Sequence, residues 1–165
     1  MTRVYIGIDP GVTGAISLID ESKTIIEDLP VVVIPNAKRK EKMISPMGLK
    51  VMIESMISSV AVDDVVCVLE KTQAMKDTAM TAFSMGQSRG IIIAVLELIG
   101  ISRIDVAPVA WKKHFSLLKC DKAASQSVAC TRRPQDEVFE LLKRKKDHNR
   151  AESLLLSLYG KEKGL

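Results

Sequence analysis

Two acidic residues, Asp9 and Glu70, stand where predicted strands end. Asp9 follows an apolar segment at 4–8 and precedes a Pro-Gly turn, and Glu70 follows the β-branched segment 65–69. Ligands of open α/β sheets gather outside the carboxyl ends of the strands, so two carboxylates there could share a cation. Strand-end carboxylates also cap turns or face water. The spacing alone leaves both interpretations open.

A third acidic group, Glu152, lies four residues after His148. On a helix this spacing places the imidazole and the carboxylate on one face, one turn apart. A stripe of apolar residues would pack the same helix onto a sheet, and it comprises Ala151, Leu154, Leu155 and Leu158. In the alternative interpretation, Asp147 caps the helix and His148 faces solvent.

Taken together, these side chains describe a divalent-metal site. Hard cations such as Mg²⁺ prefer carboxylate oxygens. Two such ions about 3.5–4 Å apart can activate a water molecule and stabilise the leaving oxygen of a phosphodiester. We therefore expect Asp9, Glu70, His148 and Glu152 to form the active site of a nuclease.

The elements that position these residues follow from hydrophobic periodicity and turn signals. The expected strands are 3–9, 15–19, 24–27, 65–69 and 104–107. The expected helices are 46–59, 78–98, 122–131, 135–142 and 150–159. A meander of three antiparallel strands, followed by alternating helices and strands, predicts an α/β fold with a mixed five-stranded sheet flanked by helices.

The chain has 165 residues, the length of one domain, so we expect a single domain over 1–165. Hydrophobic residues make up 47% and charged residues 27%, which excludes a disordered chain. Segment 30–46, with three prolines and the basic run 38–42, is expected to form an exposed basic loop.

Three further features bear on location. No apolar segment reaches the about 20 residues that a spanning helix needs, so we expect no membrane association. The first strand follows Met1 without room for a leader. The three cysteines are odd in number and contain no CxxC pair, which favours a reducing compartment over disulfides or a zinc site. We expect a cytoplasmic protein, with a mature organellar form left open.

Positive charge concentrates in the carboxyl third. Residues 111–165 carry 13 basic and 7 acidic side chains, whereas residues 1–110 carry 11 and 13. A surface that binds nucleic acid needs such a surplus, because neutralising backbone phosphates releases counterions. A solvated lysine-rich helix face would produce the same count.

Several motifs resemble those of one family. The segments 6–15, 68–70 and 85–90 and the final acidic helix resemble the RuvC Holliday-junction resolvases of the ribonuclease H-like superfamily. The segments 108–115, 120–122 and 142–155 are more similar still to the plant chloroplast resolvase and its phage and bacterial relatives. The resemblance covers nearly the whole chain in the same order.

This resemblance implies a crossover junction endodeoxyribonuclease with a ribonuclease H-like fold. Such an enzyme works as a homodimer on four-way DNA junctions during recombination and repair. It makes paired symmetric nicks with Mg²⁺ or Mn²⁺, two ions in each active site. By position, Asp9, Glu70 and Glu152 become the metal-binding acids.

The resemblance also assigns roles around these acids. His148 matches a histidine that the chloroplast branch places in the active site. RuvC instead has an aspartate three residues before its last acid, where this chain has Asn149. Whether His148 or Asp147 supplies the fourth ligand is left open. Lys122 matches an active-site lysine that could orient the attacking water or help to deprotonate it. In the alternatives it contacts phosphate, or it is a first-turn helix residue without a role in the site.

Contacts to DNA are expected from two regions. RuvC has an aromatic residue three positions after its strand-end glutamate, and this chain has Gln73 there. Gln73 and Asp77 could read base edges and Met75 could intercalate, with Lys76 beside them. The expected phosphate contacts are all basic and follow residue 111: Lys112, Lys113, Lys119, Arg132, Arg133, Lys143, Arg144, Lys145, Lys146 and Arg150.

The predicted helix 78–98 is apolar on more than one face, which indicates a contact with a second copy of the chain. Gly86 and Gly90, one turn apart, would let two such helices approach closely. In the alternative, the helix lies in the core and its glycines pack under the sheet.

Two other functions compete with the nuclease. A missing core acid would favour a protein that binds junctions without cutting them, and none of the three is missing. The turn at 9–14 also resembles the phosphate-binding turn of actin-like ATPases and sugar kinases. Those proteins need two copies of the fold, and 165 residues hold one.

Overall fold

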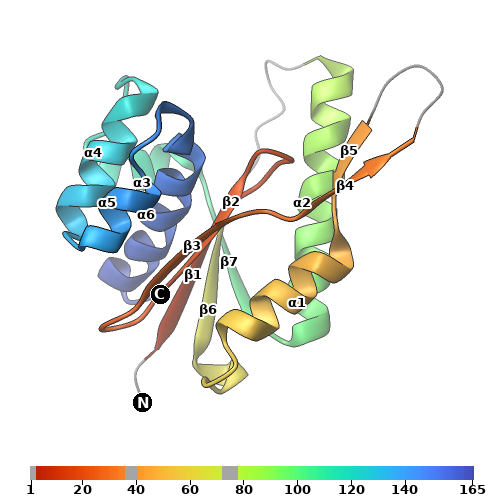
Figure 1. Ribbon diagram of the computed structural model, residues 1–165, viewed down its shortest axis with the longest axis horizontal. Coiled ribbons are helices and arrows are strands. Elements are labelled where there is room, and N and C mark those ends of the chain that lie inside the picture. Colours follow the sequence, from red (N-terminus) through yellow and green to blue (C-terminus); the bar gives the residue numbers. More distant parts are fainter. Residues whose placement is uncertain (1–2, 36–40, 72–77) are drawn as a thin grey trace.

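A mixed five-stranded sheet forms the centre of the protein, as expected (Figure 1). The computed structural model describes residues 3–35, 41–71 and 78–165. The strand order is β3-β2-β1-β6-β7. The strands are β1 (Val4–Asp9), β2 (Ala15–Ile19), β3 (Thr24–Asp28), β6 (Val65–Glu70) and β7 (Ser102–Val106). The first three are antiparallel, and β6 and β7 continue the sheet in parallel with β1.

The register of the parallel pair brings two predicted site residues to one edge of the sheet. Ile8 of β1 lies opposite Leu69 of β6. Asp9 and Glu70 are the next residues of their strands, so both lie at the carboxyl edge, where side chains can project beyond the sheet.

Helices cover both faces of this sheet. The remaining elements of the main body are α1 (Pro46–Met56), η1 (Val62–Asp64), α2 (Ala79–Ile99), α3 (Pro108–His114), α4 (Lys122–Arg132), α5 (Asp136–Leu141), η2 (Lys145–Asp147) and α6 (His148–Lys163). In Figure 1, α1 and α2 lie on one side of the sheet and α3 to α6 on the other. Each side has its own apolar core, because alternate strand residues point to opposite faces.

The closest packing joins α6 to β1 at Gly7. A Cβ atom at Gly7 would lie 2.1 Å from the Ser153 carbonyl oxygen and 2.5 Å from the Ser157 amide nitrogen. Ser17 on β2 donates from its hydroxyl to the Ser153 carbonyl oxygen at 2.8 Å. The missing side chain therefore lets α6 lie directly on the sheet, which sets the height of Glu152 relative to the strand ends.

The expectation of a loop over 30–46 is wrong for the described residues. Val31–Ile34 (β4) and Glu41–Ile44 (β5) form a separate two-stranded antiparallel sheet. Four consecutive β-branched residues favour extended backbone, and the flanking prolines only mark where the strands begin and end. The expected exposure holds for β4, where all four residues are exposed. Residues 36–40 lie outside the described part of the chain.

Helix α2 follows its predicted range and leaves one face open. Met80, Phe83 and Leu98 are 76%, 65% and 76% exposed. A Cβ atom at Gly86 or Gly90 would meet nothing within 4 Å. The alternative in which these glycines pack under the sheet is therefore wrong. By length and composition α2 could also cross a membrane, which is weak evidence because helices of globular cores pass the same test.

Candidate active site

Three carboxylates from three elements meet at the carboxyl edge of the sheet. Asp9 ends β1, Glu70 ends β6, and Glu152 lies in the second turn of α6. Burial raises the pKa of Asp9 well above its ordinary value, and the negative charges of Glu70 and Glu152 raise it further. The positive charges of Lys112 and Lys122 act in the opposite direction. The sequence prediction that these acids gather in one site is consistent with this electrostatic coupling.

Glu70 is held in place from two sides. The indole Nε1 of Trp111 donates a hydrogen bond to Glu70 Oε2 at 2.7 Å, and the Trp111 side chain is fully buried. Arg89 of α2 donates to the Glu70 carbonyl oxygen at 2.9 Å and pairs with Asp105 of β7 at 2.7 Å. These contacts fix both the carboxylate and the backbone at the end of β6.

The pKa of Glu70 is raised by burial, with a further contribution from the charge of Glu152. The hydrogen bond from Trp111 and the charge of Lys112 lower it but do not offset the burial. The surroundings of Asp9 and Glu70 therefore disfavour the ionised form of both carboxyls.

Glu152 shares its carboxylate with a lysine. Lys112 Nζ lies 3.4 Å from Glu152 Oε1, and the Ser125 hydroxyl of α4 lies 3.5 Å from the same oxygen. The Lys112 ammonium also lies 5.0 Å from the centre of the Trp111 ring. Of these two adjacent residues, Trp111 thus contacts Glu70 and Lys112 contacts Glu152.

The donor chemistry of this site suits a hard divalent cation. All three groups offer carboxylate oxygens, and a cation among them would offset the burial and the neighbouring negative charges that raise the pKa of Asp9 and Glu70. Within the described ranges, no three His, Cys, Asp or Glu side chains are already arranged as a metal-binding cluster. Trp111 engages Oε2 of Glu70 and Lys112 engages Oε1 of Glu152, so the second oxygen of each carboxylate could serve a bound ion.

Comparison with solved structures identifies the fold. The structure of Thermus thermophilus RuvC in complex with a Holliday junction substrate aligns with 98% of this chain and 96% of its own, with a TM-score of 0.61 and 12% identity. A second structure of Thermus thermophilus RuvC aligns with 98% and 97%, with a TM-score of 0.56 and 15% identity. The chain has the RuvC fold.

Sequence comparison adds nothing further, since no family model and no curated protein matches the chain. The particular closeness to the plant chloroplast resolvase stays a prediction.

Three neighbouring residues at the start of α6 make different contacts. The Asp147 side chain is buried, and its carboxylate accepts hydrogen bonds from the backbone and the guanidinium of Arg144 at 2.8–3.1 Å. Asn149 donates to the Thr13 carbonyl oxygen at 2.6 Å in the turn after β1. His148, half-buried, is left to line pockets on both sides of the helix start. The carboxylate of Asp147 is thus already engaged, whereas the imidazole of His148 forms no hydrogen bond with any residue that the structure describes.

Lys122 is the lysine to which the resemblance gives an active-site role. It is the first residue of α4, and the Asp121 side chain caps this helix by accepting from the Ala124 amide at 3.0 Å. Its charge lowers the pKa of Asp9, so it acts within the carboxylate site. It also lines a pocket of about 480 Å³ together with His148.

The predicted phosphate contacts separate into two groups. The guanidinium groups are engaged within the protein: Arg132 pairs with Glu162, Arg133 donates to Thr24 and to carbonyl oxygens after β2, Arg144 holds Asp147 and Arg150 pairs with Asp28. Lys112 pairs with Glu152, and Lys143 with Glu140 at 2.5 Å. Lys113, Lys119, Lys145 and Lys146 form no ion pair with the described residues and remain the freest candidates for phosphate.

Some functional positions lie beyond these observations. The predicted base contacts Gln73, Met75, Lys76 and Asp77 fall outside the described residues.

The sequence analysis did not identify two residues that the structure places in the site. Trp111 is the single tryptophan of the chain, and Arg89 is a charged residue within an apolar helix. These two features of the sequence could have indicated that both residues belong to the site.

Proposed function

We propose that this protein is a metal-dependent endonuclease that resolves four-way DNA junctions by paired symmetric nicks during recombination. One observation carries the proposal: Asp9 and Glu70 end neighbouring parallel strands at one sheet edge, where burial and the charge of Glu152 raise the pKa of both. The charges of Lys112 and Lys122 act on the same edge and lower the pKa of Asp9. Buried acids beside lysine side chains are typical of sites for phosphoryl chemistry. The RuvC fold supports the choice of substrate, since one similar structure contains a Holliday junction.

The carboxylates and His148 would hold Mg²⁺ or Mn²⁺, two ions to a site, which when bound supply an activated water and stabilise the leaving oxygen. Trp111 holds the Glu70 carboxylate in one orientation. Lys112 can move from Glu152 to a substrate phosphate, because its pair with Glu152 is long at 3.4 Å. Lys122 supplies positive charge near Asp9, where it can orient the attacking water.

Two symmetric nicks require two sites related by a two-fold axis, so we propose a homodimer. The exposed face of α2 supports this assembly. Phe83, Gly86, Gly90, Ala94 and Leu98 follow one another at intervals of three and four residues, and all are exposed. Small residues at the centre of this stripe let a second helix approach closely, and large apolar residues at its ends provide area to bury.

A non-catalytic junction-binding protein is the second candidate. It is favoured by the engagement of Glu70 with Trp111 and of Glu152 with Lys112. Such a protein would use the same basic surface without needing a metal.

A nicking assay on a labelled four-way junction, with and without Mg²⁺, separates these two functions. We expect Asp9→Asn, Glu70→Gln and Glu152→Gln to abolish cleavage and to leave junction binding intact, because binding depends mainly on lysines. Glu54→Gln, on the exposed surface of α1, is the matched control and keeps full activity. Metal-independent cleavage would contradict the proposed metal dependence, and binding lost in parallel with cleavage would contradict the assignment of these acids as metal ligands.

Metal binding has a second readout in the wild-type protein. Trp111 is the single tryptophan and its indole contacts Glu70, so a cation on Glu70 changes its fluorescence. We expect a saturable change with Mg²⁺ that Glu70→Gln removes. A protein that binds junctions but shows neither signal nor nicking would be the non-catalytic alternative.

A further inference from the structure

Two pockets meet at the start of α6. The first, named here the hairpin pocket, has a volume of about 520 Å³ and lies between the turn after β1, the β4–β5 sheet and η2. The second, the α4 pocket, has about 480 Å³ and lies between η2 and the start of α4, where Lys122 faces it. Lys146 and His148 line both pockets. The two hollows are therefore contiguous across these residues.

The hairpin pocket carries surplus positive charge. Its two carboxylates are already paired: Arg150 contacts both oxygens of Asp28 at 2.6 and 2.9 Å, and Arg144 holds Asp147. Lys42 and Lys146 form no ion pair with the described residues. Two ammonium groups that face one hollow repel each other, and an anion between them would relieve that repulsion.

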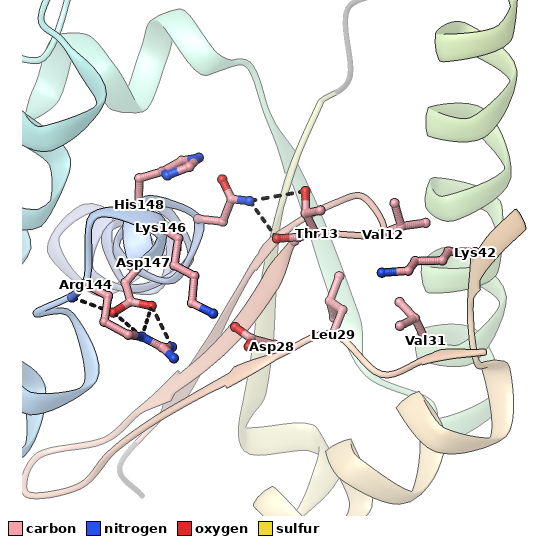
Figure 2. A pocket seen from close by; sticks show the side chains of 12 residues that line it. Val12, Thr13, Asp28, Leu29, Val31, Lys42, Arg144, Lys146, Asp147 and His148 are labelled. Carbon is pink, nitrogen blue, oxygen red and sulfur yellow. Dashed lines mark hydrogen bonds and ion pairs between the residues drawn. The ribbon is translucent and has the colours of Figure 1, made fainter. Parts of the chain in front are cut away.

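The lysines approach from opposite walls. Figure 2 shows Lys42 reaching in from the β4–β5 sheet and Lys146 from η2, on either side of Asp28 and Leu29. Apolar side chains, among them Val12, Leu29 and Val31, line the rest of the hollow. This combination of separated cations and apolar walls suits a sugar–phosphate chain better than a compact anion.

We propose that the two pockets form one groove for the backbone of a single DNA strand, running from Lys122 beside the carboxylates, past His148 and Lys146, to a phosphate contact at Lys42. The inference rests on the proposed nuclease function and extends it to the β4–β5 sheet. Lys42 lies across the hairpin pocket from η2, so a strand in contact with both spans from the active site to this sheet.

Lys42→Gln tests the groove, with Lys50→Gln on α1 as a matched loss of charge elsewhere. Affinity for a four-way junction is measured over a series of salt concentrations. Loss of one phosphate contact lowers the slope of log affinity against log salt by ~0.7 on single strands and ~0.9 on duplex. We expect this reduction and a several-fold loss of affinity for Lys42→Gln, rescue by Lys42→Arg, and no change for Lys50→Gln.

A neutral methylphosphonate placed at successive positions of each strand locates the contact. One position should weaken binding of the wild type and leave Lys42→Gln unaffected, because the charge pair is then already absent. Wild-type slope and affinity in Lys42→Gln would overturn the groove while leaving the nuclease proposal intact. Failure of the wild type to bind any junction would overturn the nuclease proposal itself.

A titration with inorganic phosphate is the last experiment, because free phosphate carries the same charged oxygens as the DNA backbone. Amide NMR shifts at residues of the hairpin pocket are followed as phosphate is added. Saturation at low concentration, combined with junction binding that is indifferent to Lys42, would make the pocket a site for free phosphate and overturn the strand groove. Competition between phosphate and junction that Lys42→Gln removes would support it.

Discussion

The hydrogen bond from Trp111 to Glu70 predicts a specific defect in Trp111→Phe. Phenylalanine retains most of the buried ring but cannot donate to Glu70 Oε2, which accepts from the indole at 2.7 Å. A hydrogen bond to a charged group contributes ~1.5–3 kcal/mol. If the whole contribution positions Glu70 for the reaction, the rate of cleavage falls ~10- to 150-fold, since each 1.36 kcal/mol corresponds to about a factor of ten.

The assay is single-turnover cleavage of a four-way junction at saturating enzyme, so that binding does not limit the rate. Junction affinity is expected to be unchanged, because Trp111 is fully buried and does not reach the DNA surface. Phe115→Leu is the control: Phe115 is a buried aromatic residue at the end of the same helix. It loses packing by a similar amount without a contact to Glu70.

Two measurements separate positioning from loss of packing. The free energy of unfolding of both variants gives the common cost of the smaller side chain. The Mg²⁺ concentration for half-maximal cleavage should rise only in Trp111→Phe, because Glu70 is then free to rotate. Equal cleavage rates in the two variants, at a temperature where both are folded, would refute the assignment of Trp111 as a positioning residue.

Three further predictions concern stability and the start of α6. Burial and the neighbouring carboxylates raise the pKa of Asp9, so its contribution to stability is complete below the ordinary pKa of aspartate and is lost as pH rises through the raised value. Without divalent metal, Asp9→Asn should therefore resist urea better than the wild type at pH 8, and equality at pH 8 would contradict this. Gly7→Ala should lower the free energy of unfolding by ~3 kcal/mol, because the added methyl group overpacks against α6. Gly86→Ala has open space around it, so it should raise the stability of the monomer by ~0.5–1 kcal/mol and weaken the dimer. Thermal melts measure the stability of both variants, and sedimentation measures the dimer. His148→Ala should slow cleavage with little change in the free energy of unfolding. Asp147→Ala should lower the free energy of unfolding by ~1–3 kcal/mol with little effect on cleavage, because it removes the hydrogen bonds to Arg144. The reverse order in the two assays would move the fourth ligand to Asp147.

The fold class and the strand ends were within reach of the sequence. The five predicted strands of the main sheet, the helix over 78–98 and the last helix depend on hydrophobic periodicity and turn residues, which act between near neighbours in the chain. For the same reason Asp9 and Glu70 could be placed at strand ends. The β4–β5 sheet was missed because prolines around 30–46 outweighed the β-branched residues of β4.

The partners of the charged side chains could not be read in the same way. Three of the arginines counted as phosphate contacts, Arg132, Arg133 and Arg150, are engaged with acceptors far away in the chain. Arg150, for example, contacts Asp28 across 122 residues. Asp147 was open to two roles, and the choice depended on where Arg144 lies once η2 has formed. Net charge records the number of cations but not which of them a fold has already paired.

The sequence by itself determined which residue types could perform metal-dependent hydrolysis and which local elements carry them. Only the tertiary structure decided that Gly7 lets α6 lie against β1, that Trp111 reaches Glu70 and that Lys112 reaches Glu152. The physical reason is the range of the interactions. Periodicity and capping are settled within a few residues, whereas burial, charge coupling and hydrogen bonding in a site depend on which surfaces pack together, and packing is a property of the whole chain.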